Sequence, residues 1–194
     1  MRITGGRFAG RRLGVPRGEV RPTADRVRES LFARLPDLAG KRVLDLFAGS
    51  GALGFEALSR GAANVVFADR SPAVLATLRD NAERLGVLDA VSLRRGEAGA
   101  VLRRLAGGHP FDLVFLDPPY ASDRLAVALA ALVSLGLLAG DALVVAESDR
   151  RHPPAPVAGL AAVDQRRYGD TLITCFVPAG PAAETDRTAE ASEA

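Results

Sequence analysis

A glycine-rich loop between an apolar run and a helical segment constrains the fold of this chain most. The loop is Gly49-Ser50-Gly51-Ala52-Leu53-Gly54, and it follows the apolar run 42–47. Glycines at these positions permit a tight turn and a close approach of the backbone to a ligand. The G-x-G-x-x-G spacing occurs in nucleotide-binding proteins of several kinds. It therefore predicts a strand, a ligand-binding turn and a helix, without identifying the ligand.

Strand-like and helical patterns alternate along the rest of the chain. We expect strands at 42–47, 64–68, 90–93, 112–116 and 142–146, and helices at 24–35, 52–60, 72–85, 98–105 and 124–134. The final pair, 161–168 and 171–177, reads as an antiparallel hairpin. The predicted fold is α/β and Rossmann-like, with a mostly parallel seven-stranded sheet, a C-terminal antiparallel hairpin and a small N-terminal β-hairpin and helix. This arrangement resembles that of class I methyltransferases.

Positive charge is concentrated near the N-terminus. Residues 1–34 contain nine arginines and three acids, whereas the net charge of the whole chain is only +2. A basic head suggests a polyanionic partner, although arginine is common along this chain and a solvated surface is the simpler reading. We divide the chain into a basic extension (1–35), a main domain (36–178) and a disordered tail (179–194).

Composition limits the other possibilities. The chain has 194 residues and one cysteine, Cys175, so no internal disulfide or cysteine metal cluster is expected. No apolar run approaches the ~20 residues of a membrane span, and the N-terminus has no apolar signal-peptide core. We expect a cytoplasmic monomer with neither a membrane nor a metal partner.

Acidic residues at strand ends suggest how a cofactor is held. Asp45 lies inside the strand before the loop, and Asp-x-Phe-x-Gly-x-Gly resembles motif I of S-adenosylmethionine (SAM) methyltransferases. Asp69 follows the second strand, where an acid can accept both ribose hydroxyls or cap the turn at Ser71. Glu97 follows the third strand, where it can receive the adenine amine or interact with a helix dipole. The predicted cofactor residues are Asp45, Phe47, Ala48, Gly49, Ser50, Gly51, Gly54, Asp69, Arg70, Glu97, Ala98 and Asp117.

The tetrapeptide Asp117-Pro118-Pro119-Tyr120 at the end of the fourth strand suits a nucleobase amine. The lone pair of such an amine is delocalised into the ring, and two acceptors on its N–H groups can direct it at a sulfonium methyl. Asp117 can supply one acceptor and the constrained carbonyl of Pro118 the other, while Tyr120 can stack on the base. A simple turn is the alternative reading. We assign Asp117, Pro118, Pro119 and Tyr120 as catalytic residues.

These residues together resemble the bacterial 16S rRNA guanine-N2 methyltransferases of the RsmD type over about residues 2–178. The resemblance is carried by the tetrapeptide together with the head 2–7, the stretches 10–13 and 21–29, the loop continuing into 56–62 and the dipeptide Glu147-Ser148. It implies a SAM-dependent enzyme that methylates N2 of guanine 966 in the small-subunit RNA. Glu97 stands where the family more often has Asp. The arginines implied as phosphate contacts are Arg7, Arg11, Arg12, Arg26 and Arg28.

Other functions share part of this pattern. A DNA adenine or cytosine amine methyltransferase has both main motifs, but this chain leaves no room for a separate DNA-recognition domain. A non-catalytic RNA-binding protein with a SAM fold would not need Asp117 and the intact loop. An NAD oxidoreductase would need a proton donor that is not evident. The roles of Thr23 and Glu147 stay open: each can support the site or only cap its element.

Overall fold

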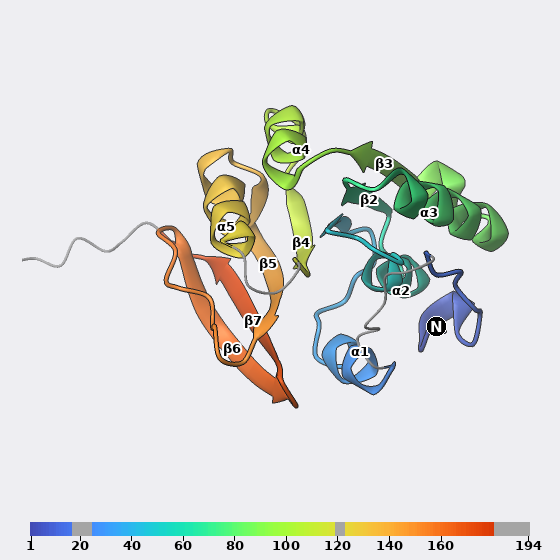
Figure 1. Ribbon diagram of the computed structural model, residues 1–194, viewed down its shortest axis with the longest axis horizontal. Helices are drawn as coiled ribbons and strands as arrows, with labels where there is room; N and C mark the ends of the chain where they lie inside the picture. Colours follow the sequence, from blue (N-terminus) through green and yellow to red (C-terminus); the bar gives the residue numbers. More distant parts are fainter. Residues whose placement is uncertain (17–24, 119–122, 181–194) are drawn as a thin grey trace, which may run out of the picture.

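The computed structural model describes residues 1–16, 25–118 and 123–180, and its seven-stranded sheet has the order β3-β2-β1-β4-β5-β7-β6 (Figure 1). The strands are β1 (Arg42–Leu46), β2 (Asn64–Asp69), β3 (Val91–Arg95), β4 (Phe111–Leu116), β5 (Leu138–Asp149), β6 (Leu160–Tyr168) and β7 (Thr171–Pro178). The helices are α1 (Asp25–Phe32), α2 (Ala52–Ser59), α3 (Pro72–Leu85), α4 (Ala98–Leu105) and α5 (Arg124–Ser134), with short 3-10 turns η1 (Gly6–Phe8) and η2 (Leu88–Ala90).

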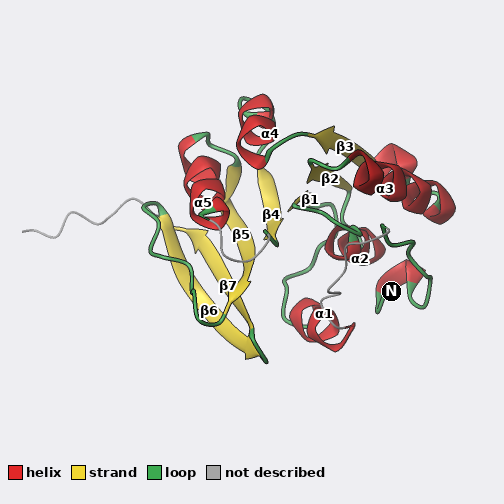
Figure 2. Cartoon of the chain, viewed as in Figure 1, coloured by secondary structure: helices red, strands yellow, loops and turns green. Residues whose placement is uncertain are grey.

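The predicted fold is confirmed. Strands β1 to β5 pair in parallel, β7 runs antiparallel to β5, and β6 closes the sheet as the antiparallel partner of β7 (Figure 2). Each parallel connection needs a crossover, which the intervening helices supply. Among the described residues, no helix is long and apolar enough to cross a membrane.

The helices cover both faces of the sheet, so the central parallel strands β1, β2 and β4 are buried on two sides, whereas the edge strand β3 is only partly buried. Along β1, Val43 belongs to the core that α1, α2 and α3 complete, whereas Leu44 and Leu46 belong to the core under α4 and α5. Successive side chains of a strand point to opposite faces. This alternation fixes which acidic residues share a face at the ends of the strands.

Element ends differ from the prediction where turns and caps decide them. β5 begins at Leu138 rather than near residue 142, and its pairing with β4 is irregular between Phe111 and Leu113. Helix α3 follows its sequence signals: the Ser71 side chain accepts a hydrogen bond from the Val74 N–H, and Gly86 ends the helix in a left-handed conformation. The predicted cap Thr23 and most of the predicted tail, from residue 181, lie outside the described residues.

The N-terminal arm, residues 1–16, packs against the body of the protein. Arg2 and Arg12 form an antiparallel bridge, as expected for a small hairpin, and the side chains of Ile3 and Leu13 are buried in the core on the α2 side. The side-chain amide of Asn81 on α3 pairs with the backbone of Gly14, accepting from its N–H at 2.8 Å and donating to its carbonyl at 3.0 Å. The arm is therefore held at several points along its length.

The carboxylate of Glu56 on α2 anchors the beginning of this arm. Its side chain is fully buried and accepts hydrogen bonds from the N–H groups of Thr4 and Gly5, each at 2.8 Å, and from the Thr4 hydroxyl at 2.7 Å. It also pairs with Arg28 at 3.4 Å and Arg60 at 2.9 Å. A buried charge is tolerated when donors satisfy its lone pairs in this way.

Gly54 allows α2 to lie directly on the sheet. A Cβ added there would come within 2.3 Å of the Phe67 ring and 2.9 Å of Val65, both on β2. At Gly99 in α4, by contrast, an added Cβ would meet only the Arg103 side chain, at 3.6 Å. The two helix glycines therefore differ in what surrounds them, not in their secondary structure.

We predict that Gly54→Ala lowers the free energy of unfolding by about 1–3 kcal/mol, because the added methyl overpacks the contact between α2 and β2. Gly99→Ala is the matched control, and it should raise this free energy by about 0.4–1 kcal/mol by restricting the unfolded chain. Urea unfolding of both variants measures the difference. Equal stability of the two variants would contradict the packing assigned to Gly54.

Candidate active site

Four acidic residues gather on one face at the carboxyl edge of the parallel strands. Asp45 on β1, Asp69 on β2 and Asp117 after β4 share the face of Phe67 and Phe115, since Asp45 pairs with both phenylalanines in the strand register. The fourth residue, Glu147 on β5, lies one position beyond the pair Leu116–Ala146 and thus beside Asp117. Ligands of open parallel sheets bind at this edge.

The glycine loop begins with a sharp change in backbone direction. Phe47 has φ 67°, a left-handed conformation that is uncommon for a residue other than glycine. The N–H groups of Phe47 and Ala48 both donate to the carbonyl of Ala68, at 3.0 and 3.1 Å. Gly51, with φ 75°, then caps α2. The turn therefore bends away from β1 while it remains tied to the end of β2.

Two of the acids hold this loop in place. Asp45 is buried and accepts a hydrogen bond from the Gly54 N–H at 2.9 Å. Burial raises the pKa of Asp45 well above its usual range, although the Gly54 hydrogen bond opposes this and the nearby Asp117 and Asp69 add to it. Asp69 accepts from the N–H of Gly49 at 3.2 Å and from that of Ser71 at 2.9 Å. The turn-capping role of Asp69 is thus present in the structure.

Further along the edge, Glu97 precedes α4. Its carboxylate is exposed, makes no capping hydrogen bond and lies 3.8 Å from the guanidinium of Arg70. Ala98 follows as the first residue of the helix. The structure therefore brings Arg70, Glu97 and Ala98 together at the ends of β2 and β3, with the Glu97 oxygens accessible from solvent.

Asp117 is the second acid of the site whose pKa burial raises. Burial raises its pKa to about 7, and the neighbouring charge of Glu147 contributes. Glu147 is itself partly buried and accepts a hydrogen bond from the Thr171 hydroxyl at 3.5 Å. Pro118 is buried, whereas Pro119 and Tyr120 lie outside the described residues. The sequence leaves open whether Glu147 supports the site or only caps its strand, and the pairing of β5 with β4 brings it beside Asp117.

The predicted phosphate contacts fall into two groups. Arg7, Arg11, Arg12 and Arg26 are exposed, and Arg11 also donates to the Arg84 carbonyl at 2.7 Å. The expectation for Arg28 is wrong. Its side chain is completely buried, where it pairs with Glu56 and donates to the carbonyl of Arg2, and a phosphate group cannot reach it. Arg28 serves to join α1 to the arm and to α2.

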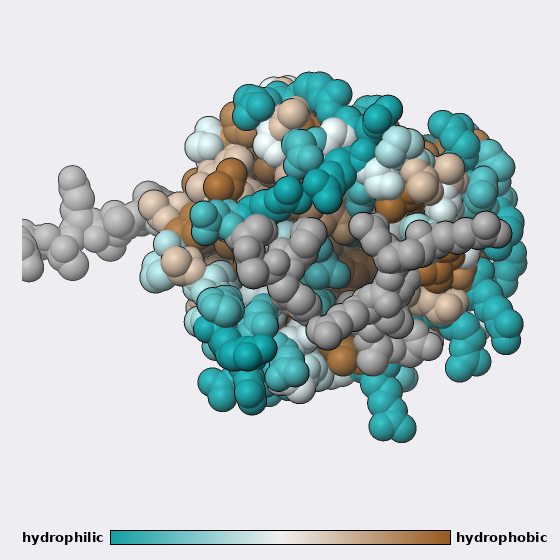
Figure 3. Space-filling view, in the orientation of Figure 1, coloured by the Kyte–Doolittle hydropathy of each residue, from teal (hydrophilic) through white to brown (hydrophobic). Residues whose placement is uncertain are grey.

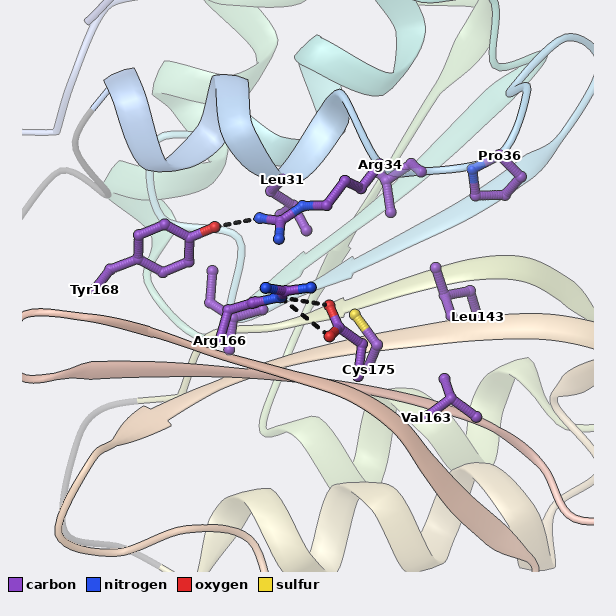
Figure 4. A pocket seen from close by; sticks show the side chains of 11 residues that line it. Leu31, Arg34, Pro36, Leu143, Val163, Arg166, Tyr168 and Cys175 are labelled. Atoms are coloured by element: carbon purple, nitrogen blue, oxygen red, sulfur yellow. Dashed lines mark hydrogen bonds and ion pairs between the residues drawn. The ribbon is translucent and has the colours of Figure 1, made fainter.

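A separate pocket of about 240 Å³ lies between the end of α1 and the strands β5, β6 and β7 (Figure 4). Leu31, Leu143 and Ile173 form part of its wall, and Figure 4 shows Arg34 directed at the hydroxyl of Tyr168 across it. None of the predicted cofactor or catalytic residues lines this pocket. It therefore contributes no group to the chemistry proposed for the carboxyl edge.

Comparison with known proteins gives the family. The family model described as conserved hypothetical protein 95 matches residues 1–177. Ribosomal RNA small subunit methyltransferase D of Escherichia coli strain K12 is 42% identical over 151 residues, which cover 77% of this chain and 75% of that protein. The chain belongs to the RsmD family of methyltransferases.

A second relative and a solved structure show how far the family likeness extends. YlbH of Bacillus subtilis is 36% identical over 184 residues, covering 93% of this chain and 100% of YlbH. The solved structure of YhhF from Escherichia coli is 36% identical, has a TM-score of 0.83, and covers 92% of this chain and 97% of that chain. The likeness thus includes the N-terminal arm as well as the sheet.

We predict that a carbon-13 NMR titration of the Asp117 carboxyl gives a pKa of about 7. Glu147→Gln should lower that pKa, because a neighbouring negative charge is removed while the burial remains. Glu83→Gln on the exposed side of α3 is the matched control and should leave it unchanged. A value that Glu147→Gln does not move would show that the two carboxylates are not coupled.

Proposed function

We propose that this chain transfers a methyl group from SAM to the exocyclic N2 amine of a guanine in 16S rRNA, and that the target is guanine 966. The position of Asp117 carries the proposal. It places a carboxylate on the same face as the glycine loop and directly beside Glu147, at the edge where parallel sheets bind ligands. The family, and the printed name of its Escherichia coli member, support RNA of the small subunit as the substrate.

The residues of this edge fit SAM. Bound there, SAM would supply an electrophilic methyl group on a sulfonium. Each Asp69 oxygen accepts one backbone N–H and retains a free lone pair that can accept a ribose hydroxyl. The exposed carboxylate of Glu97 could accept the adenine amine, and Asp45, which fixes the glycine loop, would lie near the methionine portion. We include Phe47, Ala48, Ser50 and Gly51 in this set as loop residues.

Asp117 and Pro118 would prepare the amine for attack. As a carboxylate, Asp117 accepts one N–H of the amine, and the carbonyl of Pro118 accepts the other. Together they draw the nitrogen lone pair out of the ring and orient it for in-line displacement. The transfer forms an N–C bond, breaks the S–C bond and releases a proton. With a pKa near 7, Asp117 is suited to receive that proton directly or through water.

The target guanine must leave its stack to reach this site, and base extrusion is easier from single-stranded or irregular RNA. In our proposal Pro119 and Tyr120 complete the base-binding site. The exposed arginines Arg7, Arg11, Arg12 and Arg26 would hold the flanking phosphates. They give affinity without sequence information, which leaves the choice of base to the site itself.

We predict that Asp117→Ala lowers methyl transfer to small ribosomal subunits lacking this modification by on the order of a hundredfold or more. SAM binding, measured by calorimetry, should persist. Glu83→Ala, at an exposed position of α3, is the control and should keep full activity. Loss of SAM binding in Asp117→Ala would instead assign this residue to the cofactor.

Nucleoside analysis of the wild-type product should give N2-methylguanosine, whereas label in duplex DNA would favour a DNA amine methyltransferase.

We further predict that Arg11→Ala with Arg12→Ala weakens RNA binding and reduces the slope of log K against log salt by roughly 1.4–1.8, the contribution of two phosphate contacts. Binding of a small-subunit rRNA transcript at several salt concentrations measures this. The control removes Arg151 and Arg166, which are exposed but paired with Asp149 and Asp164. An unchanged slope in the Arg11/Arg12 variant would exclude the arm as a main contact.

A further inference from the structure

Five exposed arginines surround the ends of β2 and β3 and the helix α4, and we call them the β3–α4 arginine surface. They are Arg70, Arg94, Arg95, Arg103 and Arg104. Within residues 91–110 the sequence contains four arginines and a single acid, Glu97. In Figure 3 hydrophilic residues gather over the part of the molecule where α4 lies. This surface is separate from the basic N-terminal arm.

The structure holds these arginines close together. The guanidinium of Arg104 donates to the Arg95 carbonyl at 2.7 Å, so the last turn of α4 is tied to the end of β3. In the strand register Arg94 pairs with Ala68 and Arg95 with Asp69, and their side chains therefore point to opposite faces of the sheet. The positive charge thus continues around the edge strand from one face to the other.

The charge of three of these arginines is not neutralised by any acidic group among the described residues. Within the described ranges, the side chains of Arg94, Arg95 and Arg103 make no hydrogen bond or ion pair. By contrast, Arg151 after β5 and Arg166 on the opposite edge strand β6 are each paired with an aspartate, at 3.5 and 3.1 Å. Unpaired like charges in one place repel each other. A polyanion would neutralise this surface.

The position of the surface favours the RNA substrate as that polyanion. β3 lies three strands from β4 in the sheet, so its carboxyl end is roughly 14 Å from that of β4 at ~4.8 Å per strand. The Ser50 hydroxyl, on the glycine loop that we call the cofactor loop in this proposal, contacts the Met1 sulfur at 3.4 Å. The arm therefore reaches the same edge of the sheet from the face that α2 and α3 cover. The arm and the surface thus border the cofactor loop from different sides.

We propose that the β3–α4 arginine surface binds the phosphate backbone of the RNA on the far side of the cofactor loop from the N-terminal arm. This inference rests on the proposed function. Each guanidinium presents a planar fork of donors that matches two phosphate oxygens. An RNA strand bound to both the N-terminal arm and the β3–α4 arginine surface would pass over the carboxyl edge of the sheet. It would then present the extruded base to Asp117.

The test replaces Arg94, Arg95 and Arg103 with alanine in the full chain and measures binding of a small-subunit rRNA transcript between low and high salt. We expect the slope of log K against log salt to fall by roughly 2.1–2.7, for three contacts, and the affinity at low salt to fall at least several-fold. SAM affinity and thermal unfolding should be unchanged, because these side chains are exposed and bonded to no other described group.

The matched control replaces Arg151, Arg166 and Arg167, which are also exposed, and it removes the same net charge. An equal loss in both triple variants would overturn the proposal, because net charge alone would then explain it. So would loss of SAM affinity with an unchanged RNA slope, which would make this a cofactor surface. A wild-type protein that neither binds nor methylates the RNA would refute the proposed function itself, whereas an active wild type with an unaffected triple variant refutes this surface alone.

Discussion

The burial of a single carboxylate, that of Glu56, connects the parts of this protein. Removing a carboxylate from water costs several kcal/mol unless donors replace the lost hydration. Here the donors come from three segments: Thr4 and Gly5 in the arm, Arg28 in α1 and Arg60 at the end of α2. Since no segment alone satisfies this charge, its desolvation links the position of the arm and α1 to that of α2, the helix that follows the glycine loop.

The candidate site divides its acids between structure and chemistry. Asp45 and Asp69 accept backbone N–H groups of the loop and of the turn after β2, so much of their hydrogen-bonding capacity stabilises the backbone there. Burial raises the pKa of Asp45 as well, whereas that of Asp117 is raised to about 7, by burial and by the charge of Glu147. A carboxyl group in such a place changes its protonation easily near neutral pH. Rigid loop acids and a labile acid thus share one edge of the sheet.

The fold could be predicted from the sequence because strand and helix periodicities are local. The site residues stay a prediction, but their common edge follows from the same local signals, since Asp45 lies near the end of β1, Asp69 ends β2 and Asp117 follows β4. The burial of Arg28 was missed because its partner, Glu56, is 28 residues away. A local signal existed: Arg28 is three residues before Leu31 and four before Phe32, both buried, and therefore lies on the same side of α1. The contacts of the site residues with SAM and RNA could not be predicted in detail, because they also depend on the shape and position of those ligands.

The anchoring of the arm has a consequence for how the chain folds during synthesis. The arm leaves the ribosome before the body that it packs against, yet Thr4 must wait for a partner 52 residues later, and Gly14 for one 67 residues later. Domains fold as their residues emerge, and contacts between distant residues form slowly because the intervening loop must close. Ile3 and Leu13 therefore remain without their core until α3 has been made. The arm is thus translated before the body of the protein but acquires its native contacts only after much of that body has been made.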